Sequence, residues 1–317
     1  MTRLRLAPLV FAPLAFTLAC SSSAPSASTP TAATPTASTT ASTRCASVIQ
    51  GSARFGSTVS VTCDGTYAYI ASQGLPSHQM MNGITASNQQ VPLPQDFTGA
   101  NAWKIPLTPT RAATPVSYDL FNGPIGVAVN GVPIFNPDRP GNNGPVDTKA
   151  GGELDVCNGH AGRADDYHYH AAPTCMMADI DATRQPIGWA VDGYGIYGFT
   201  RADGTTPARD ACGGETDPAT GDYRYHATAA YPYLLGCFTG NPVPAAQVPK
   251  TTPVRPPGNP VTVTNVSLTV EADGWQRMTY VTSAGTSAIR YRQTSSRCWD
   301  FQFIEPGGRI TPATYCR

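Results

Sequence analysis

The chain has 317 residues, including 30 Gly and 30 Pro, and only 13% of its residues are charged. This composition favours short strands and turns over long amphipathic helices, and the length allows one large domain or two modest ones. Basic and acidic residues number 21 each, so the formal net charge is zero. This balance excludes the basic surface that is typical of a protein that binds nucleic acid.

The first residues indicate export. Two arginines precede an apolar run over residues 6–18, which is too short to span a bilayer. The run ends at Cys20 in the order Thr-Leu-Ala-Cys, which predicts a lipoprotein signal peptide over residues 1–20 and a lipidated Cys20 that anchors the chain to a membrane. A plain secretory signal is the alternative. Both interpretations place the protein outside the cytoplasm, and the first makes it a cell-envelope lipoprotein of the outer membrane or cell surface.

Residues 21–44 are expected to form a disordered tether. Residues 21–43 contain only Ser, Ala, Pro and Thr, so the segment lacks the apolar side chains that would offset the loss of chain entropy on folding. Behind a lipidated Cys20, such a tether would hold a folded body away from the membrane surface.

Eight cysteines follow Cys20, an even number that is typical of a disulfide-bonded exported protein. They fall into four local pairs about 18 to 25 residues apart: Cys45 and Cys63, Cys157 and Cys175, Cys212 and Cys237, Cys298 and Cys316. A disulfide that closes a loop of this size contributes about 3 kcal/mol in the chain-entropy model. We therefore expect sequential pairing. Free-thiol or metal-binding pairs are the alternative, which the absence of Cys-x-x-Cys disfavours.

Two stretches of the chain are alike. Residues 124–137 read PIGVAVNGVPIFNP and residues 186–199 read PIGWAVDGYGIYGF, so each predicts a type I′ hairpin, turning at Asn130-Gly131 and at Asp192-Gly193. The likeness extends through a Cys-x-Gly element, a Tyr-x-Tyr-His element and a second Cys. Repeat units therefore span residues 124–175 and 186–237. We infer a tandem duplication that folds as one pseudo-two-fold, mainly β domain over residues 45–240.

The flanking segments complete the expected architecture. Within residues 45–85, two alternating runs around Cys63 predict a further hairpin, and residues 89–115 are expected to form an extended loop over the sheets. Residues 241–260 resemble a Pro-rich linker. Alternating runs within residues 261–317 predict a small β domain or extension, closed by its last two cysteines, that is either separate or packed on the main body.

Three of the five histidines, His160, His168 and His170, lie within eleven consecutive residues. Side chains two apart in a strand share a face at about 7 Å spacing, so His168 and His170 should point one way and the adjoining tyrosines the other. His-x-His presents two imidazoles to one ion, and His160 from an adjoining loop would complete a three-nitrogen set for copper or zinc. A fourth position held by water would permit a hydrolytic or redox reaction. Without an ion, the same run is a half-buried structural strand.

The second unit is not equivalent to the first. At the three corresponding positions it has Glu215, Arg224 and His226, and an arginine cannot ligate a metal because it stays protonated. We therefore expect one site rather than two. Either His226 joins the first site as a fourth ligand, with Glu215 as a further ligand or base, or the second half has lost its site. For Glu215 and Arg224 a mutual salt bridge is the preferred interpretation.

Other candidate residues have simpler explanations. His78 is isolated in a loop, where a histidine more often forms hydrogen bonds than ligates a metal, and the methionines beside it are common core residues. Asp192 stands at a position where a hairpin turn favours aspartate. Asp165 and Asp166 are candidates for orienting a histidine ring, although exposed loop carboxylates are the default expectation.

Taken together, these elements resemble the YHYH-domain family of exported bacterial proteins. The resemblance rests on Cys-Asn-Gly-His, Tyr-His-Tyr-His, the Pro-Ile-Gly-x-Ala-x-Asp-Gly hairpin and Tyr-Pro-Tyr-Leu-Leu-Gly-Cys, and it covers about residues 118–240, with weaker similarity around residues 59–95. The family typically repeats the Asn-Gly and histidine pattern in both copies, and this chain departs from it at Gly213, Glu215 and Arg224. The resemblance implies a fold and an extracytoplasmic compartment rather than an activity, because the family has no settled biochemical function.

A second hypothesis is a non-metal binding module at the cell surface that recognises glycan or peptide. Its contact residues would be exposed tyrosines, which are enriched in interfaces: Tyr194, Tyr197, Tyr231 and Tyr233. A nucleophilic hydrolase is disfavoured, because no Gly-x-Ser-x-Gly occurs and every mature cysteine has an expected partner.

Overall fold

The computed structural model describes residues 40–87, 89–141 and 144–317. The signal peptide predicted over residues 1–20, and the tether up to residue 39, lie outside these ranges. Helix α1 (Ala41–Ser52) begins the described part, and the hydroxyl of its N-cap Thr40 accepts a hydrogen bond from the amide of Thr43. The prediction of disorder up to residue 44 is therefore wrong for residues 41–44, because a capped helix with Val48 in the core begins there.

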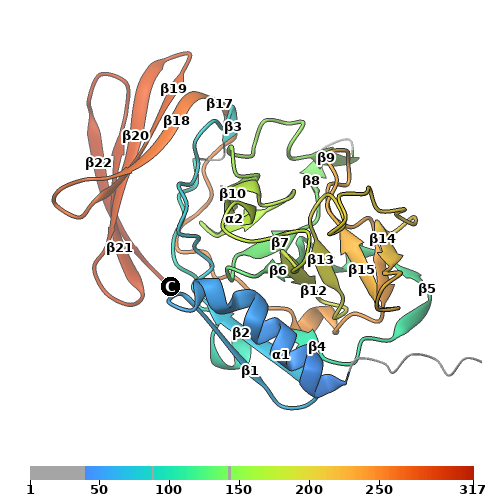
Figure 1. Ribbon diagram of the computed structural model, residues 1–317. Helices are drawn as coiled ribbons and strands as arrows, with labels where there is room; N and C mark the ends of the chain where they lie inside the picture. The colour runs from blue at the N-terminus through green and yellow to red at the C-terminus, as the bar shows by residue number, and fades with distance from the viewer. Residues whose placement is uncertain (1–39, 88, 142–143) are drawn as a thin grey trace, which may run out of the picture. The chain divides into compact units, whose positions relative to one another are not determined.

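Helix α1 packs against a three-stranded antiparallel sheet in the order β1-β2-β4 (Figure 1). Its strands are β1 (Val59–Cys63), β2 (Tyr67–Ser72) and β4 (Trp103–Pro106). A disulfide between Cys45 and Cys63 joins the helix to β1, and the hairpin predicted in this region is confirmed. The extended loop predicted over residues 89–115 is wrong in its second half, because alternately buried residues there form β4, and β5 (Arg111–Val116) follows.

The largest sheet has eight strands in the order β10-β11-β7-β6-β12-β13-β15-β14 (Figure 1). Its first half consists of β6 (Pro124–Ala128), β7 (Pro133–Phe135), β10 (Gly159–Ala161) and β11 (Tyr167–Tyr169). Its second half consists of β12 (Gly188–Ala190), β13 (Gly195–Tyr197), β14 (Gly214–Thr216) and β15 (Tyr223–His226). In each half the hairpin is antiparallel, the next pairing parallel and the outermost antiparallel. The two units thus pair their strands alike, while the tandem duplication stays a prediction.

The two hairpins form where the sequence predicted them, with a different turn. In each, the amide of the glycine, Gly131 or Gly193, donates to the carbonyl three residues back. These glycines have φ angles of 78° and 92°, whereas Asn130 and Asp192 lack the positive φ that a type I′ turn requires. The type I′ prediction is therefore wrong: each loop has three residues and ends in a left-handed glycine. Asn130 and Asp192 are consequently buried rather than displayed at a turn.

Strands β6 and β12 approach closely at the centre of the large sheet. A Cβ on Gly126 would lie 2.6 Å from the carbonyl oxygen of Trp189, and a Cβ on Gly188 would lie 2.8 Å from that of Val127. Neither backbone oxygen can move aside cheaply. The glycine of each Pro-Ile-Gly motif is therefore required by the contact between the two hairpins.

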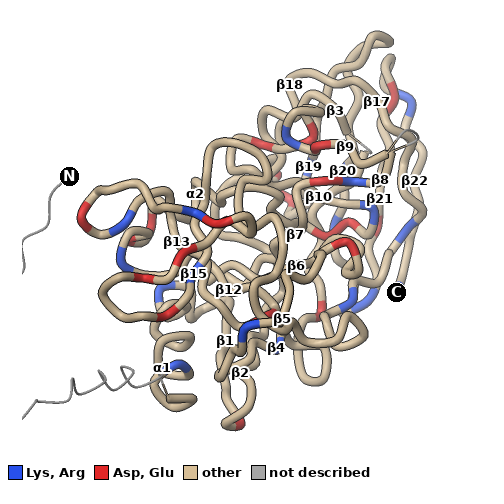
Figure 2. The backbone as a smooth tube through the Cα atoms, turned by 90° about the vertical axis from the view of Figure 1, so that its right-hand side faces the viewer, with Lys and Arg blue, Asp and Glu red and all other residues tan. Residues whose placement is uncertain are grey.

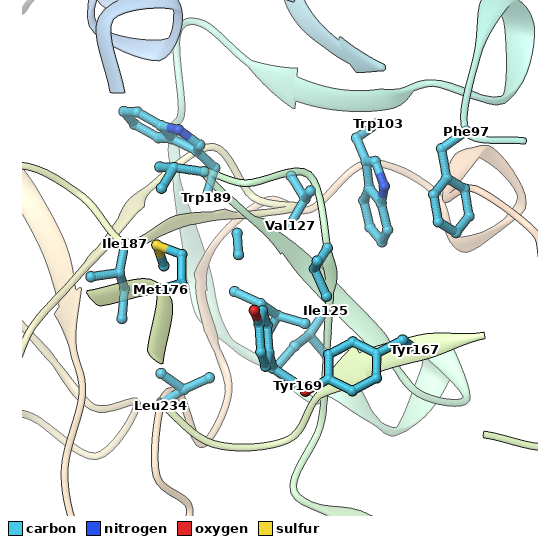
Figure 3. Close-up of a cluster of buried hydrophobic side chains, with 14 of the residues drawn as sticks. Phe97, Trp103, Ile125, Val127, Tyr167, Tyr169, Met176, Ile187, Trp189 and Leu234 are labelled. Atoms are coloured by element: carbon cyan, nitrogen blue, oxygen red, sulfur yellow. The ribbon is translucent and has the colours of Figure 1, made fainter. Parts of the chain in front are cut away.

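A large hydrophobic core lies against this sheet (Figure 3). Trp103 of β4, Val127 of β6, Tyr169 of β11 and Trp189 of β12 are each at most 3% exposed. Full burial of a large apolar side chain stabilises a fold by roughly 1.5–3 kcal/mol. The tyrosines of the Tyr-His-Tyr-His run therefore anchor β11 in the core.

All four disulfides join sequential cysteines, as predicted: Cys45–Cys63, Cys157–Cys175, Cys212–Cys237 and Cys298–Cys316. Short helical segments lie between the strands: η1 (Ala53–Phe55), η2 (Gly99–Asn101), η3 (Tyr118–Phe121), α2 (Thr174–Met177) and η4 (Ala245–Gln247). Three two-stranded pairs complete the main body: β3 (Ala86–Ser87) with β17 (Val261–Thr262), β5 with β16 (Phe238–Gly240), and β8 (Asp138–Gly141) with β9 (Gly144–Asp147).

The chain ends in a small five-stranded antiparallel sheet, as the alternating runs within residues 261–317 predicted. Its strands, in chain order, are β18 (Thr264–Val270), β19 (Gln276–Thr282), β20 (Gly285–Gln293), β21 (Cys298–Ile304) and β22 (Ile310–Cys316). The sheet packs on the main body, since the hydroxyl of Tyr280 donates to Gln89 Oε1 at 2.8 Å. The segment 241–260 is packed rather than a free linker, because Arg255 is 6% exposed and pairs with Asp165 at 2.9 Å.

In the described ranges, no helix is long and apolar enough to cross a membrane.

Candidate metal centre

Strands β10 and β11 bring three histidines together, which we call the three-histidine cluster. His160 in β10 lies opposite His168 in β11, and His170 follows two residues later on the same face. The Nε2 atoms of His168 and His170 are 3.0 Å apart, and those of His170 and His160 are 3.2 Å apart. One ligand nitrogen from each residue lies within 4.8 Å of the others. Three of the four predicted site residues therefore converge.

Backbone carbonyls orient two of the rings. Nδ1 of His168 donates to the carbonyl of Asp166 at 2.9 Å, and Nδ1 of His170 donates to the carbonyl of Asn136 at 2.5 Å. A carbonyl oxygen only accepts, so each Nδ1 carries the proton and each Nε2 keeps a lone pair aimed at the centre of the cluster.

The spacing of the cluster fits a transition-metal ion. Lone pairs 3.0 Å apart repel one another unless a positive charge lies between them. Three nitrogens about 2.05 Å from a tetrahedral ion lie about 3.3 Å from one another, close to the separations in this cluster. Carbonyl-bound Nδ1 atoms also match the usual support of a metal-ligating imidazole.

Residues outside the histidine motif shape the cluster. The ring of Phe135 stacks on His168, with centroids 3.8 Å apart. A Cβ on Gly162 would lie 2.4 Å from Cε1 of His168, so glycine leaves the space that the ring needs. Arg139 forms an ion pair with the buried Glu153, which has a backbone hydrogen bond with His160. Phe135, Arg139 and Glu153 carry no signal in the sequence, because their roles depend on contacts between separate chain segments.

The two aspartates before β11 are both buried, so the expectation of exposed carboxylates is wrong. Oδ2 of Asp166 lies 3.2 Å from Nδ1 of His168, which is the ring-orienting position considered from the sequence. Asp165 instead accepts a hydrogen bond from the amide of Val91 and pairs with Arg255. Burial raises the pKa of Asp165 to about 6, against the opposing effect of Arg255.

The opposite face of β11 is held by hydrogen bonds. Tyr167 donates to Asp155 Oδ2 at 2.8 Å, and the hydroxyl of Tyr169 accepts from Asn130 Nδ2 at 3.0 Å. Nε2 of His78 lies 2.6 Å from the same hydroxyl, so the prediction that His78 forms hydrogen bonds is confirmed. Although His78 also lies near Cys157 and Cys175, these two sulfurs are bonded to each other and offer no thiolate.

The cluster is enclosed on one side and open at His160. His168 and His170 are each 4% exposed, and His160 is partly exposed. Burial lowers the pKa of His160 and of His170 well below the usual 6.5, and the neighbouring imidazoles lower it further. Both rings are therefore neutral at neutral pH, which is the form that binds a metal.

We expect the metal-free protein to lose stability as the pH falls below about 6.5. The unfolded chain then binds protons that the folded His160 and His170 refuse, so the free energy of unfolding decreases by up to about 2.7 kcal/mol per pH unit for two protons. Urea unfolding at several pH values measures this slope. The variant His160→Gln, His170→Gln lacks both groups and should have a shallower slope, which does not vanish because His226, whose pKa burial also lowers, still titrates in it. Equal slopes for the wild-type chain and this variant would contradict the assignment of the pH dependence to His160 and His170.

His226 does not join the three-histidine cluster, so its prediction as a fourth ligand is wrong. It lies in β15, where its Nδ1 donates to the carbonyl of Gly198 at 3.0 Å and its Nε2 lies 3.4 Å from Glu215 Oε1. Strand pairing places it in the other half of the large sheet from His170. The two Tyr-x-Tyr-His runs, which are equivalent in sequence, thus lie at equivalent but separate positions in the two halves of the sheet.

The predicted salt bridge between Glu215 and Arg224 forms, though it is the weaker contact of each residue. Their closest atoms are 3.9 Å apart, whereas Arg201 Nη2 lies 2.5 Å from Glu215 and Arg224 Nη1 lies 2.9 Å from Asp217. The residues of these ion pairs come from the segments around β13, β14 and β15, where basic and acidic residues lie close together (Figure 2).

The tyrosines proposed for a surface binding module are mostly not at the surface. Tyr194 and Tyr233 are 6% and 7% exposed and Tyr197 is partly buried, whereas Tyr231 is 51% exposed. Three of these rings contribute to packing, and one exposed ring makes no binding face. The expectation of an exposed tyrosine surface is therefore wrong.

Fold and site together define a disulfide-bonded, mainly β protein with three converging imidazoles on one sheet. Residues 102–212 match the family described as YHYH protein, which confirms the resemblance inferred from the motifs. The matched region contains the first unit and the hairpin of the second. No curated protein and no solved structure shows a significant match to the chain.

Proposed function

We propose that this chain is an exported, lipid-anchored YHYH-domain protein that binds one copper or zinc ion through His160, His168 and His170. The observation that carries the proposal is the convergence of three Nε2 atoms, at 3.0 and 3.2 Å, with the Nδ1 protons of His168 and His170 held by backbone carbonyls. Imidazole suits both metals, and no thiolate or thioether in the cluster selects between them.

The partial exposure of His160 supports an open coordination position. Three protein ligands leave a tetrahedral ion one position for water or substrate, which is the pattern of catalytic rather than closed structural sites. When bound, zinc would supply Lewis-acid chemistry and copper would supply electron transfer. The chain's own contribution is to orient the rings, through Asn136 and Asp166, and to exclude water from all but one side.

Export and anchoring rest on residues 1–20 and on the four disulfides. An oxidising compartment is where such bridges persist, so the disulfides support an extracytoplasmic location. Mass spectrometry of the mature N-terminus, which either carries a diacylglycerol on Cys20 or does not, checks the anchor.

Metal content tests the proposed function directly. We expect the oxidised protein, stripped with a chelator and then loaded with zinc or copper and desalted, to retain one equivalent of ion by elemental analysis. The variant His160→Gln, His168→Gln, His170→Gln should retain none. A wild-type chain that retains less than about a tenth of an equivalent, and shows no heat of binding on titration, would rule the proposal out.

A further inference from the structure

The second unit repeats the backbone arrangement that holds the three-histidine cluster, but it places other side chains there. We call this arrangement the frame. Glu215 lies opposite Arg224 across β14 and β15, in the register in which His160 lies opposite His168. Nδ1 of His226 donates to the carbonyl of Gly198, as Nδ1 of His170 donates to that of Asn136. These contacts give the two frames the same backbone support.

Aromatic stacking is also the same in both frames. Phe135 of β7 stacks on His168, and Tyr197 of β13 lies under the guanidinium of Arg224 at 4.8 Å. The two aromatic residues occupy equivalent places in the repeated hairpins. Arg224 therefore occupies the position of an imidazole ligand, over the same kind of ring.

The frame around Arg224 already holds balanced charges. Glu215 pairs with Arg201 at 2.5 Å, and Asp217 pairs with Arg224 at 2.9 Å. The second guanidinium nitrogen of Arg224 lies 3.9 Å from Glu215, so its charge is shared by two carboxylates. Two cations and two anions leave no net charge to attract a further cation.

His226 shows that the frame retains an unused ligand atom. Its Nε2 is buried and has no hydrogen-bond partner among the described residues, and it lies 3.4 Å from Glu215 Oε1. A lone pair that faces a carboxylate at this distance is the arrangement of two metal ligands that lack an ion. A pocket of about 430 Å³, lined by Arg201 and Glu215 among others, reaches the Glu215 side of the frame.

We propose that Arg224 is the internal cation of a second metal-site frame, and that its guanidinium, beside the closer ion pair of Glu215 with Arg201, keeps Glu215 and His226 from binding a metal. The proposal rests on the proposed function, because it assumes that the shared frame is a metal-site frame. It explains why one chain with two similar units would bind a single ion. The substitution Arg224→His should open a site with two imidazoles and one carboxylate, a ligand set known for divalent ions.

Metal stoichiometry tests the proposal with zinc as the probe. We expect Arg224→His to retain one more equivalent of zinc than its parent, in the wild-type chain and in a chain whose first site is removed by His170→Ala. The matched control Arg224→Lys keeps the positive charge and should add none. Cobalt absorption bands of the extra site, lost on adding His226→Ala, identify the ligands.

The outcomes separate this proposal from the proposed function. If the wild-type chain binds no zinc but Arg224→His binds one equivalent, the first site fails and the second frame stands. The inference is overturned if Arg224→His has native circular dichroism but binds no more zinc than its parent. It is also overturned if the wild-type chain binds zinc and loses it on the substitution His226→Ala. Should Arg224→His not fold, thermal unfolding of Arg224→Gln in the His170→Ala chain, which lacks the first site, takes its place: its midpoint should rise with zinc, and an unchanged midpoint overturns the inference.

Discussion

The variant His170→Ala should lose metal binding, whereas His226→Ala should keep it. His170 contributes the Nε2 atom that lies 3.0 Å from that of His168 and 3.2 Å from that of His160, so its nitrogen is within 3.2 Å of both other ligand atoms. Loss of residues that only support metal ligands costs about 10–100-fold in affinity, so loss of this ligand should cost more than about 100-fold. Isothermal titration with zinc and with copper measures the change.

His226→Ala is a closely matched control. Both histidines end a Tyr-x-Tyr-His run, are buried, and donate from Nδ1 to a backbone carbonyl of the preceding hairpin. Each substitution therefore removes a similar packing volume and one hydrogen bond. The two variants should lose similar free energy of unfolding and differ only in metal affinity. Equal loss of affinity in both variants would show that the effect is one of folding rather than of ligation.

Local patterns in the sequence predicted the parts of the site that lie in one strand. The alternation of Tyr167, His168, Tyr169 and His170 is enough to place the two imidazoles on one face, because strand geometry alone decides it. Sequential disulfides followed in the same way from short spacing. The hairpins followed from apolar runs around a glycine, and all three predictions are confirmed.

What the sequence could not predict depends on contacts between distant segments. Asp165 is buried because Arg255, ninety residues later, pairs with it, and no local pattern reports that partner. A type I′ turn would account for Asp192 from the sequence, yet Asp192 accepts a hydrogen bond from Tyr225 at 2.5 Å in the core. The sequence allows His226 to join the first site because it does not say how the two units pair. In the sheet the units meet at β6 and β12, which places β15 in the other half from β11.

The disulfide Cys157–Cys175 closes the loop that contains all three clustered histidines, which couples the stability of the fold to the geometry of the site. Asn158, beside the bridge, donates to the carbonyl of Ala172 at 2.7 Å, so the two ends of the loop are also joined by a hydrogen bond. Within this loop, β10 and β11 pair through only three residues each. A short ladder of this kind depends on its closed ends to keep His160 opposite His168.

Removal of this bridge should therefore weaken both folding and metal binding. The variant Cys157→Ala, Cys175→Ala opens a loop with a sequence separation of 18, which should cost about 3 kcal/mol of unfolding free energy. Its metal affinity should fall by about 10-fold or more, as for other losses of support around a metal ligand. Because the ion binds only the folded form, the remaining affinity should still raise the unfolding midpoint on adding zinc.

The first disulfide of the chain supplies the control for this prediction. Cys45–Cys63 has the same sequence separation of 18 and joins α1 to β1, away from the histidine strands. The variant Cys45→Ala, Cys63→Ala should lose a similar free energy of unfolding, because the chain-entropy term depends on loop length alone. Its zinc affinity, measured by titration well below the unfolding midpoint, should match that of the wild-type chain. If both double variants lost metal affinity alike, the bridge between Cys157 and Cys175 would have no special part in holding the three imidazoles together.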